Sequence, residues 1–175
     1  MDHLPIFINI RKKPCIVIGG GDIALRKINL LLKAQAKVDC LSPSFSRDIK
    51  NLSKDGHITL INKSFDQTDI KDYSIIIAAT DDSSVNSSIS AIAQVKKIPV
   101  NVVDSPELSS FIMPSIVDRS PLIIAVSSSG KAPVLSRIIR AKLETVIPSA
   151  YGILADIAGE YRQKVKDRFS TIKDR

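Results

Sequence analysis

The feature that most constrains the fold is a glycine-rich turn placed directly after a short apolar run. Residues 15–18 have the length and the Ile/Val content of a buried strand, and they lead into Gly19-Gly20-Gly21. With Ala24 in the last place, the segment matches the pattern G-x-G-x-x-A. The first glycine of that pattern makes the turn, the second lets backbone approach a pyrophosphate, and the third small residue permits close helix–strand packing. The segment predicts a strand–turn–helix unit that binds a dinucleotide.

Short apolar runs alternate with helix-like stretches through the first hundred residues. The stretches at 22–34 and 83–97 repeat apolar side chains at helical spacing. The runs are rich in Ile and Val without clean alternation, as in strands that are covered on both faces. They lie at residues 15–18, 38–41, 58–61, 75–79 and 100–103. Strands that alternate with helices predict an α/β fold with a doubly wound, mainly parallel, Rossmann-like sheet.

The alternation stops near residue 113, where we place a domain boundary. Beyond it, short extended runs lead into a helix expected at 132–147, and Pro148 separates this helix from a basic one. The prediction is a dinucleotide-binding domain over 1–113, a small α+β segment over 114–148 and the start of a C-terminal helical region over 149–175.

The net charge is +7, from 25 Lys and Arg against 18 Asp and Glu, and most of the excess falls in residues 114–175. A polyanionic partner would explain it, whether nucleic acid, a membrane surface or an anionic small molecule. A solvated basic helix or compositional drift explains it equally well. The charge alone therefore leaves the partner open.

Other global features favour a cytoplasmic location. No apolar run approaches the ~18 residues of a membrane helix, and residues 1–5 lack the charged-then-apolar shape of a signal peptide. Cys15 and Cys40 both lie inside apolar runs. This placement predicts two buried thiols in a reducing compartment.

The position that distinguishes NAD from NADP is undecided. An acidic residue that holds the adenosine ribose should close the second strand, about 20 residues after the glycines. Asp39 lies inside that strand, so we do not expect its carboxylate to reach the ribose. Hydroxyl or backbone groups of residues 42–44 could hold the ribose, and Arg47 could attract a 2′-phosphate. The motif leaves both cofactors open.

Polar residues follow two other strands, at the edge where a doubly wound sheet binds its ligands. Thr80 and Asp81 follow the run at 75–79, and Asp104 follows the run at 100–103. Asp104 is the candidate for proton transfer or for a transient metal contact, because its strand should end nearest the nicotinamide. Asp-Ser-Pro is also good turn chemistry, so a turn aspartate is the alternative interpretation.

Two further features are less specific. Residues 127–130 (SSSG) stand before the helix expected at 132–147, where they can form either a helix cap or an anion-holding turn. The histidines, His3 and His57, are far apart in the sequence and neither lies beside a cysteine. This separation disfavours a resident multi-histidine metal site.

Six strings of residues together resemble the siroheme synthase family. They are residues 1–7 (MDHLPIF), 18–22 (IGGGD), 78–82 (AATDD), 101–104 (NVVD), 109–115 (SSFIMPS) and 118–122 (DRSPL). The resemblance is to that family's N-terminal precorrin-2 dehydrogenase/sirohydrochlorin ferrochelatase module, and it spans essentially the whole chain in one register. The later strings are far more specific than the glycine motif.

The resemblance implies NAD-dependent dehydrogenation of precorrin-2 to sirohydrochlorin, followed in the same site by insertion of Fe²⁺ to give siroheme. It places the catalytic aspartate, with its transient metal contact, on Asp104. It places NAD contacts on the glycine loop, Gly19 and Gly21 with Asp22 and Ile23, and on Pro43 and Ser44. Thr80 and Asp81 complete the cofactor-binding residues that we expect.

Substrate contacts are expected from Asn101, Ser128, Lys131 and Arg137. The family's phosphorylated serine falls on Ser128, within a loop that departs from the family's Ser-Ser-Gly-Gly. The basic residues of the last third divide into two groups. We expect some side chains to face the substrate cleft in the first group, which consists of Arg119, Lys131, Arg137 and Arg140. We expect a solvated helix face in the second group, which consists of Arg162, Lys164, Lys166 and Arg168.

The resemblance also implies partners. It predicts a homodimer joined through about 114–148, a tetrapyrrole as the anionic ligand and a fused or separate uroporphyrinogen-III methyltransferase, with no nucleic acid and no membrane. Two alternatives stay open from the residues alone. One is an NAD(P)-dependent oxidoreductase of another substrate class. The other is a non-enzymatic dinucleotide sensor, which would need a recognition helix or a basic patch interleaved with aromatic residues.

Overall fold

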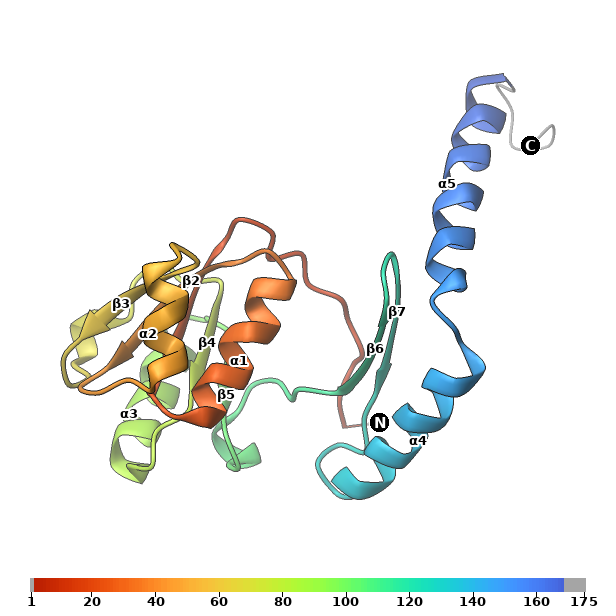
Figure 1. The fold of residues 1–175 in the computed structure, drawn as a ribbon. Coiled ribbons are helices and arrows are strands. Elements are labelled where there is room, and N and C mark those ends of the chain that lie inside the picture. The colour runs from red at the N-terminus through yellow and green to blue at the C-terminus, as the bar shows by residue number, and fades with distance from the viewer. Residues whose placement is uncertain (1, 169–175) are drawn as a thin grey trace. The chain divides into compact units, whose positions relative to one another are not determined.

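The computed structural model describes residues 2–168 and divides into two compact units (Figure 1). The units are Met1–Ile112 and Met113–Arg175. The division falls next to residue 113, where the alternation of strands and helices stops in the sequence. Each unit has its own secondary structure and is described by itself below.

The first unit is built on a five-stranded parallel sheet in the order β3-β2-β1-β4-β5. The strands are β1 (Pro14–Ile18), β2 (Lys37–Ser42), β3 (Ile58–Asn62), β4 (Ile75–Ala78) and β5 (Val100–Val102). The order reverses between β1 and β4, which is the switch point where doubly wound sheets bind ligands. The predicted α/β, Rossmann-like fold is confirmed.

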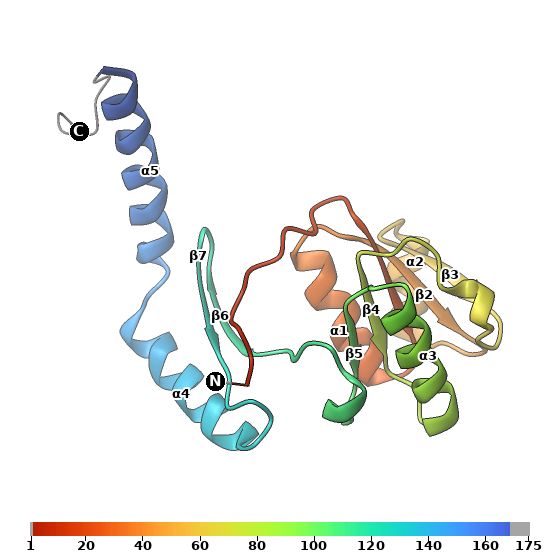
Figure 2. The same cartoon turned by 180° about the vertical axis from the view of Figure 1, so that it is seen from behind.

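Helices cover both faces of this sheet. Figures 1 and 2 show α1 (Asp22–Lys33) and α2 (Arg47–Lys54) on one face and α3 (Ser83–Val95) on the other. Two short 3-10 turns, η1 (Gln67–Asp69) and η2 (Pro106–Leu108), complete the unit. Because both faces are covered, β4 and β5 are buried at every position, whereas the edge strand β3 is buried only at Ile58. The helix α2 has no strong sequence signal, since Ile49 is its one buried residue.

The second unit is a small α+β assembly. Its strands β6 (Ser115–Arg119) and β7 (Leu122–Val126) form an antiparallel hairpin, with a cis peptide bond between Ser120 and Pro121 in the turn. Helices α4 (Pro133–Val146) and α5 (Ala150–Arg168) follow, close to the predicted bounds. In α5, a Cβ at Gly152 would lie 2.6 Å from the carbonyl oxygens of Arg119 and Ser120, so the helix needs glycine where it crosses the hairpin turn. No helix within residues 2–168 is both long and apolar enough to span a bilayer.

Candidate dinucleotide-binding site

The three consecutive glycines have different packing requirements. Gly19 has a φ of +135°, a conformation that L side chains rarely adopt, and a Cβ there would overlap the carbonyl oxygen of Ala79. A Cβ at Gly20 would overlap the carbonyl oxygen of Ser44. Gly21, by contrast, has no atom within 4 Å of the position of its Cβ. The first two glycines are therefore required by the fold, and the third leaves open space for a ligand.

The start of α1 is suited to an anion. Gly21 is the N-cap residue of α1, and no side chain caps the helix there. The first N–H groups of a helix lack intrahelical partners and carry the positive end of its dipole. Since a glycine side chain leaves them uncovered, a pyrophosphate can approach them closely. The local geometry fits the dinucleotide predicted from the motif.

A cavity of about 970 Å³ opens in front of this helix end. It is lined by the ends of β1, β2 and β4, by the first turn of α1 and by the loop after β3. All of the expected cofactor-binding residues line it, namely Gly19, Gly21, Asp22, Ile23, Pro43, Ser44, Thr80 and Asp81. The tertiary structure thus brings together three segments of the chain that are far apart in sequence.

The wall beyond β2 consists of uncharged groups. Ser42, Ser44 and Ser46 line the cavity there, and the Ser46 N–H donates to the Gly20 carbonyl at 2.8 Å, which holds this loop against the glycine turn. Asp39 lies inside β2 and accepts a hydrogen bond from the Tyr73 hydroxyl at 2.9 Å, as expected for a carboxylate that does not reach the ribose. Arg47 is exposed on α2 and is not among the residues that line the cavity.

Sequence reasoning missed part of the cavity wall. Ser64 and Phe65 come from the loop after β3, and Phe45 comes from the loop after β2. No motif marks these residues, and they reach the cavity only because β3 and β2 are neighbours in the sheet. Arg26 was also missed, although it follows Asp22 by one helical turn and so lies on the same face of α1.

The loop after β4 is fixed by the start of α3. Asp82 is the N-cap of α3, and its carboxylate accepts from the N–H groups of Ser84 at 2.8 Å and Val85 at 3.2 Å. Hydrogen bonds from Ser84 and Val85 hold the pKa of Asp82 below its usual range. Its carboxylate therefore has a capping role, and Thr80, Asp81 and Asp82 of this loop all line the cavity.

Asp104 follows β5, the neighbour of β4 at the same edge of the sheet. It is exposed and has a φ of +58°, a left-handed conformation that aspartate tolerates better than most residues. Lys27 on α1 lies close enough for the two charges to interact. Burial lowers the pKa of Lys27 and the charge of Asp104 opposes that shift. Lys12, Gln35, Lys97 and Ser129 share this conformation, so it does not by itself mark a functional site, and Asp104 is not among the residues that line the cavity.

Asn101 has a structural contact. Its side chain is 7% exposed and donates to the Phe111 carbonyl at 3.1 Å, which ties β5 to the segment that follows it. Contact between Asn101 and a substrate stays a prediction. Within residues 2–168, no three His, Cys, Asp or Glu side chains gather into a metal-binding group.

Ser128 and Lys131 lie in the loop before α4. The Ser128 hydroxyl accepts from the Ala132 N–H at 3.0 Å, and the Ser128 carbonyl accepts from the Lys131 N–H at 3.0 Å. The N-cap of α4 is Ala132 and no side chain caps the helix, so these contacts close the loop before α4 and do not cap it. Lys131 and Arg137 are exposed in the second unit. Their substrate contacts, and the phosphorylation of Ser128, stay predictions.

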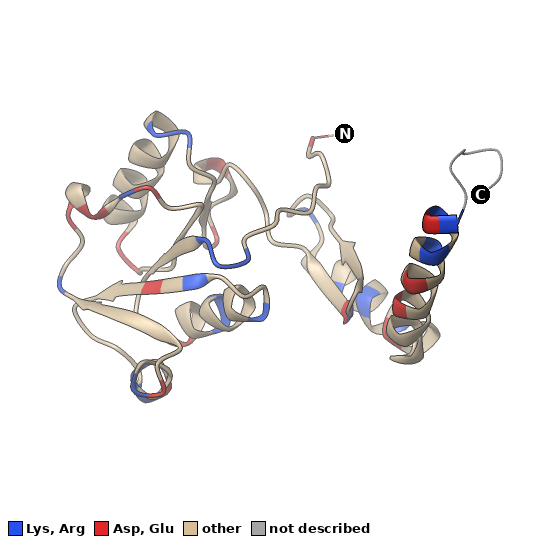
Figure 3. Ribbon diagram, turned by 90° about the horizontal axis from the view of Figure 1, so that it is seen from above, with Lys and Arg blue, Asp and Glu red and all other residues tan. Residues whose placement is uncertain are grey.

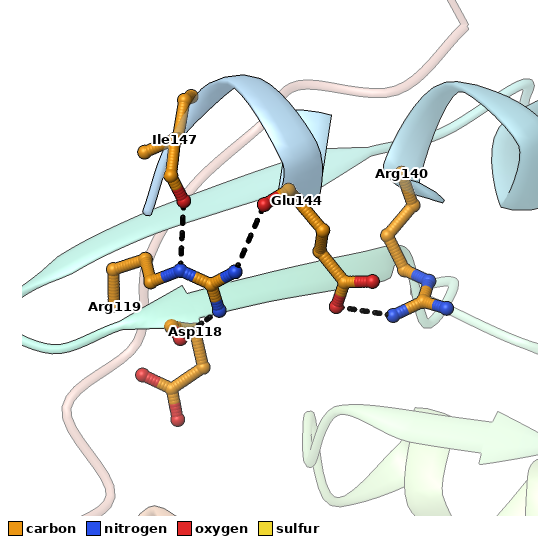
Figure 4. Close-up of polar contacts among 5 residues, drawn as sticks. All are labelled: Asp118, Arg119, Arg140, Glu144 and Ile147. Atoms are coloured by element: carbon orange, nitrogen blue, oxygen red, sulfur yellow. Dashed lines mark hydrogen bonds and ion pairs between the residues drawn. The ribbon is translucent and has the colours of Figure 1, made fainter. Parts of the chain in front are cut away.

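Arg119, one of the four residues among which cleft-facing side chains are expected, makes contacts within the second unit. Its guanidinium donates to the carbonyl oxygens of Ile147 at 2.8 Å, Glu144 at 3.3 Å and Asp118 at 3.0 Å (Figure 4). Carbonyls at the end of a helix lack intrahelical partners, so Arg119 caps the C-terminus of α4. Arg140 forms an ion pair with Glu144 at 2.6 Å. The guanidinium groups of Arg119 and Arg140 thus both bind partners within the second unit.

The charged residues of α5 carry both signs (Figure 3). Arg162, Lys164, Lys166 and Arg168 are all exposed, as expected for a solvated helix face. Lys164 lies over the ring of Tyr161, with its Nζ 5.3 Å from the ring centroid. Four basic residues of α5 stand against three acidic ones, so this helix holds little of the basic excess of the last third.

Three family matches cover the chain from residue 6 onward. Residues 6–115 match the family described as "Putative NAD(P)-binding", residues 119–145 match "Sirohaem biosynthesis protein central" and residues 150–175 match "Sirohaem synthase dimerisation region". The first match spans more than half of the chain, so the chain belongs to this NAD(P)-binding family. The two later matches, both to sirohaem families, confirm the resemblance found in the six strings.

Individual relatives agree with these matches. The chain is 57% identical over 175 residues to the siroheme synthase of Ruthia magnifica subsp. Calyptogena magnifica, and 51% identical over 170 residues to that of Nitrosomonas europaea. These alignments cover 100% and 97% of this chain but only 37% and 36% of the relatives. The solved structure of SirC, precorrin-2 dehydrogenase, has the same fold, with a TM-score of 0.82 and 23% identity over 98% of this chain and 84% of that chain.

Proposed function

We propose that the chain catalyses the NAD-dependent dehydrogenation of precorrin-2 to sirohydrochlorin and then inserts Fe²⁺ to give siroheme. The observation that carries the proposal is identity of 57% to a siroheme synthase along the whole chain. The cavity at the switch point of the sheet supplies a dinucleotide site that fits this chemistry. An oxidoreductase of another substrate class would share only the glycine loop, whereas the similarity here extends over all 175 residues.

Different residues of the chain bind the cofactor and take up the proton. The N-terminus of α1 and the open face of Gly21 hold the pyrophosphate, and the walls of the cavity orient the two nucleoside ends. NAD, when bound, supplies the hydride acceptor. Each dehydrogenation also releases one proton, and we assign its uptake to the Asp104 carboxylate. Asp104 suits this role because it is exposed at the end of β5, beside the strand whose loop lines the cavity.

The same carboxylate would assist chelation. Insertion of Fe²⁺ displaces protons from the pyrrole nitrogens of the macrocycle, so the site needs a base near the metal. A single oxygen ligand suits a metal that is a substrate, because a closed set of ligands would retain the ion. Asp104 can therefore serve both steps in turn.

The second unit supports association. Residues 150–175 match a dimerisation region, and α5 exposes large apolar side chains. We infer a homodimer in which these faces are covered, with the segment 114–148 contributing contacts. A methyltransferase partner, fused or separate, belongs to the same proposal, because the chain spans only 37% of a longer siroheme synthase. We also propose a cytoplasmic location.

The decisive experiment is spectroscopic. The protein is incubated anaerobically with precorrin-2 and NAD, formation of NADH and sirohydrochlorin is followed, and Fe²⁺ is then added. We expect both steps, and Asp104→Asn should slow the first by about 100-fold or more, as expected for loss of a general base. Asparagine also tolerates the left-handed backbone at this position, so the variant should fold. If NADH binds but precorrin-2 is not oxidised, the substrate class is wrong.

A further inference from the structure

Thr80 and Asn86 are joined by two hydrogen bonds beside the cofactor cavity. The Asn86 Nδ2 donates to the Thr80 carbonyl at 3.0 Å, and the Thr80 hydroxyl donates to Asn86 Oδ1 at 2.8 Å. Thr80 lines the cavity. Asn86, on α3, is 7% exposed and is not among the lining residues. Asn86 can therefore influence a ligand in the cavity only through Thr80.

The directions of these two bonds follow from the chemistry of the groups. A backbone carbonyl can only accept, so the amide nitrogen of Asn86 must face it. The amide oxygen then faces the Thr80 hydroxyl and can only accept, so the hydroxyl must donate. The other acceptor near this hydroxyl is the Asp82 carbonyl, at 3.2 Å. The Thr80 hydroxyl therefore donates its single proton to an acceptor of the protein and has none left for a ligand.

Asn86 is itself held in place by hydrogen bonds at the start of α3. The Asn86 N–H donates to the Asp82 carbonyl at 3.0 Å, within the first turn of α3. The Asp82 carboxylate caps the same turn. Asn86 therefore lies on a fixed helix end, and it holds both the carbonyl and the hydroxyl of Thr80.

We propose that Asn86 is a positioning residue that makes the Thr80 hydroxyl a hydrogen-bond acceptor toward the cofactor. An acceptor in this position selects for an O–H or N–H of the ligand. Thr80 follows β4, on the side of β1 away from the β2 loop where the adenosine ribose is expected. The donor is therefore a hydroxyl of the nicotinamide-side ribose or the carboxamide of the nicotinamide. Ionised phosphate oxygens carry no proton, so the Thr80 hydroxyl does not bind the pyrophosphate. The inference rests on the dinucleotide binding proposed above.

The test measures the affinity of the full chain for NAD⁺, ADP-ribose and ADP by calorimetry. Thr80→Val keeps the shape of the side chain and removes the hydroxyl. We expect binding of NAD⁺ to weaken about threefold to tenfold, the loss typical of one hydrogen bond, and binding of ADP to stay unchanged. If ADP-ribose weakens equally, the donor is a hydroxyl of the ribose that ADP lacks. If ADP-ribose is unaffected, the donor is the carboxamide.

Conservative and matched variants separate positioning from folding. Thr80→Ser keeps a hydroxyl and should restore most of the affinity for NAD⁺. Asn86→Ala should show the same ligand pattern as Thr80→Val, with a rise in KM for NAD and little change in kcat. Ser90→Ala is the matched control, because Ser90 is also buried on α3 but its hydroxyl donates to the Leu108 carbonyl at 2.6 Å. It should leave the affinity for NAD⁺ unchanged.

Several results would overturn the inference. One is an equal loss of ADP and NAD⁺ affinity in Thr80→Val, which would indicate a contact to the adenosine or phosphate groups that ADP shares with NAD⁺. Another is unchanged NAD⁺ affinity in both Thr80→Val and Asn86→Ala. If Asn86→Ala does not fold, the comparison of Thr80→Val with Thr80→Ser decides. If the wild-type protein binds no NAD⁺, the proposed function itself is wrong, and that failure is visible before any variant is made.

Discussion

The two units of the chain differ in what they do with their apolar side chains. Among the described residues, every buried hydrophobic residue except Val117 belongs to the first unit. The second unit exposes large apolar residues on both of its helices, for example Leu135 at 53% and Leu154 at 59%. The first unit has a five-stranded sheet with helices on both faces, whereas the second has only a hairpin and two helices. A two-stranded hairpin offers too little surface to cover such helices.

This contrast shows that a similar helical pattern can have two outcomes. The apolar side chains of α1 recur at helical spacing and are buried against a sheet at Ala24, Ile28 and Leu31. Those of α4 recur in the same way but remain exposed at Leu135 and Ile138. Exposed apolar patches of this kind mark interaction surfaces. The second unit therefore carries the features of an interface, and the first those of a closed domain.

The largest expected effect comes from placing charge on the exposed face of α5. Leu154 and Ile157 are 59% and 46% exposed and lie on one face of the helix. Burial of each such side chain contributes about 1.5–3 kcal/mol, and both copies of a dimer would lose it. We expect Leu154→Glu with Ile157→Glu to convert the dimer to monomers in light scattering. Asp156→Lys, a charge change on the opposite side of α5, should leave the dimer intact. A wild-type protein that is already monomeric would contradict the contrast between the units.

The next largest effect is a difference in stability between alanine variants of two adjacent glycines in the first unit. Gly20→Ala would place a Cβ on the carbonyl oxygen of Ser44, so we expect the protein to lose about 3 kcal/mol of stability or not to fold. Gly21→Ala meets no atom within 4 Å and should fold normally, but its methyl group would stand where the pyrophosphate approaches. Thermal denaturation and NADH fluorescence titration measure the two properties. Equal melting temperatures for the two variants would refute this difference.

A smaller effect is expected at the cap of α4. Arg119→Ala leaves carbonyl oxygens of Glu144 and Ile147 without their charged donor, which should cost about 1–3 kcal/mol in the second unit. Arg140→Ala removes only a half-exposed ion pair with Glu144 and should cost under about 1 kcal/mol. Chemical denaturation checks both. Titration with NADH should show unchanged affinity, because the dinucleotide site lies in the first unit.

The smallest effect concerns the thiols of the first unit. Burial raises the pKa of Cys40 from 9.0 to about 12, and that of Cys15 to about 11. Both thiols should therefore resist iodoacetamide in the native protein at about pH 8 and react once it is unfolded. Because the folded pKa values are raised, the stability linked to these groups is complete below pH 9.0 and is lost as the pH rises toward about 11 and 12. Denaturant midpoints measured across that range should fall. Rapid alkylation of the native protein would show that the two thiols are not buried in the first unit.

Much of the first unit was predictable from local sequence. The expected strands at 15–18 and 75–79 are Pro14–Ile18 and Ile75–Ala78 in the structure. These runs carry their own signal, because a strand covered on both faces must be apolar along its whole length. Helix α2 was not predicted, since its one buried residue, Ile49, gives no helical repeat. Its start depends instead on Ser46, whose hydroxyl caps the helix.

By itself, the sequence determined the order of the elements, the glycine turn, the family and the strand ends at which Thr80 and Asp104 stand. Those features are local, or they persist as strings of residues along the chain. The tertiary structure alone decided which loops meet at the cavity, which includes Phe65 from the loop after β3. It also decided that Arg119 caps α4, a contact that no pattern in the sequence indicates. The direction of a polar side chain depends on which unpaired groups lie near it, and only packing brings such groups together.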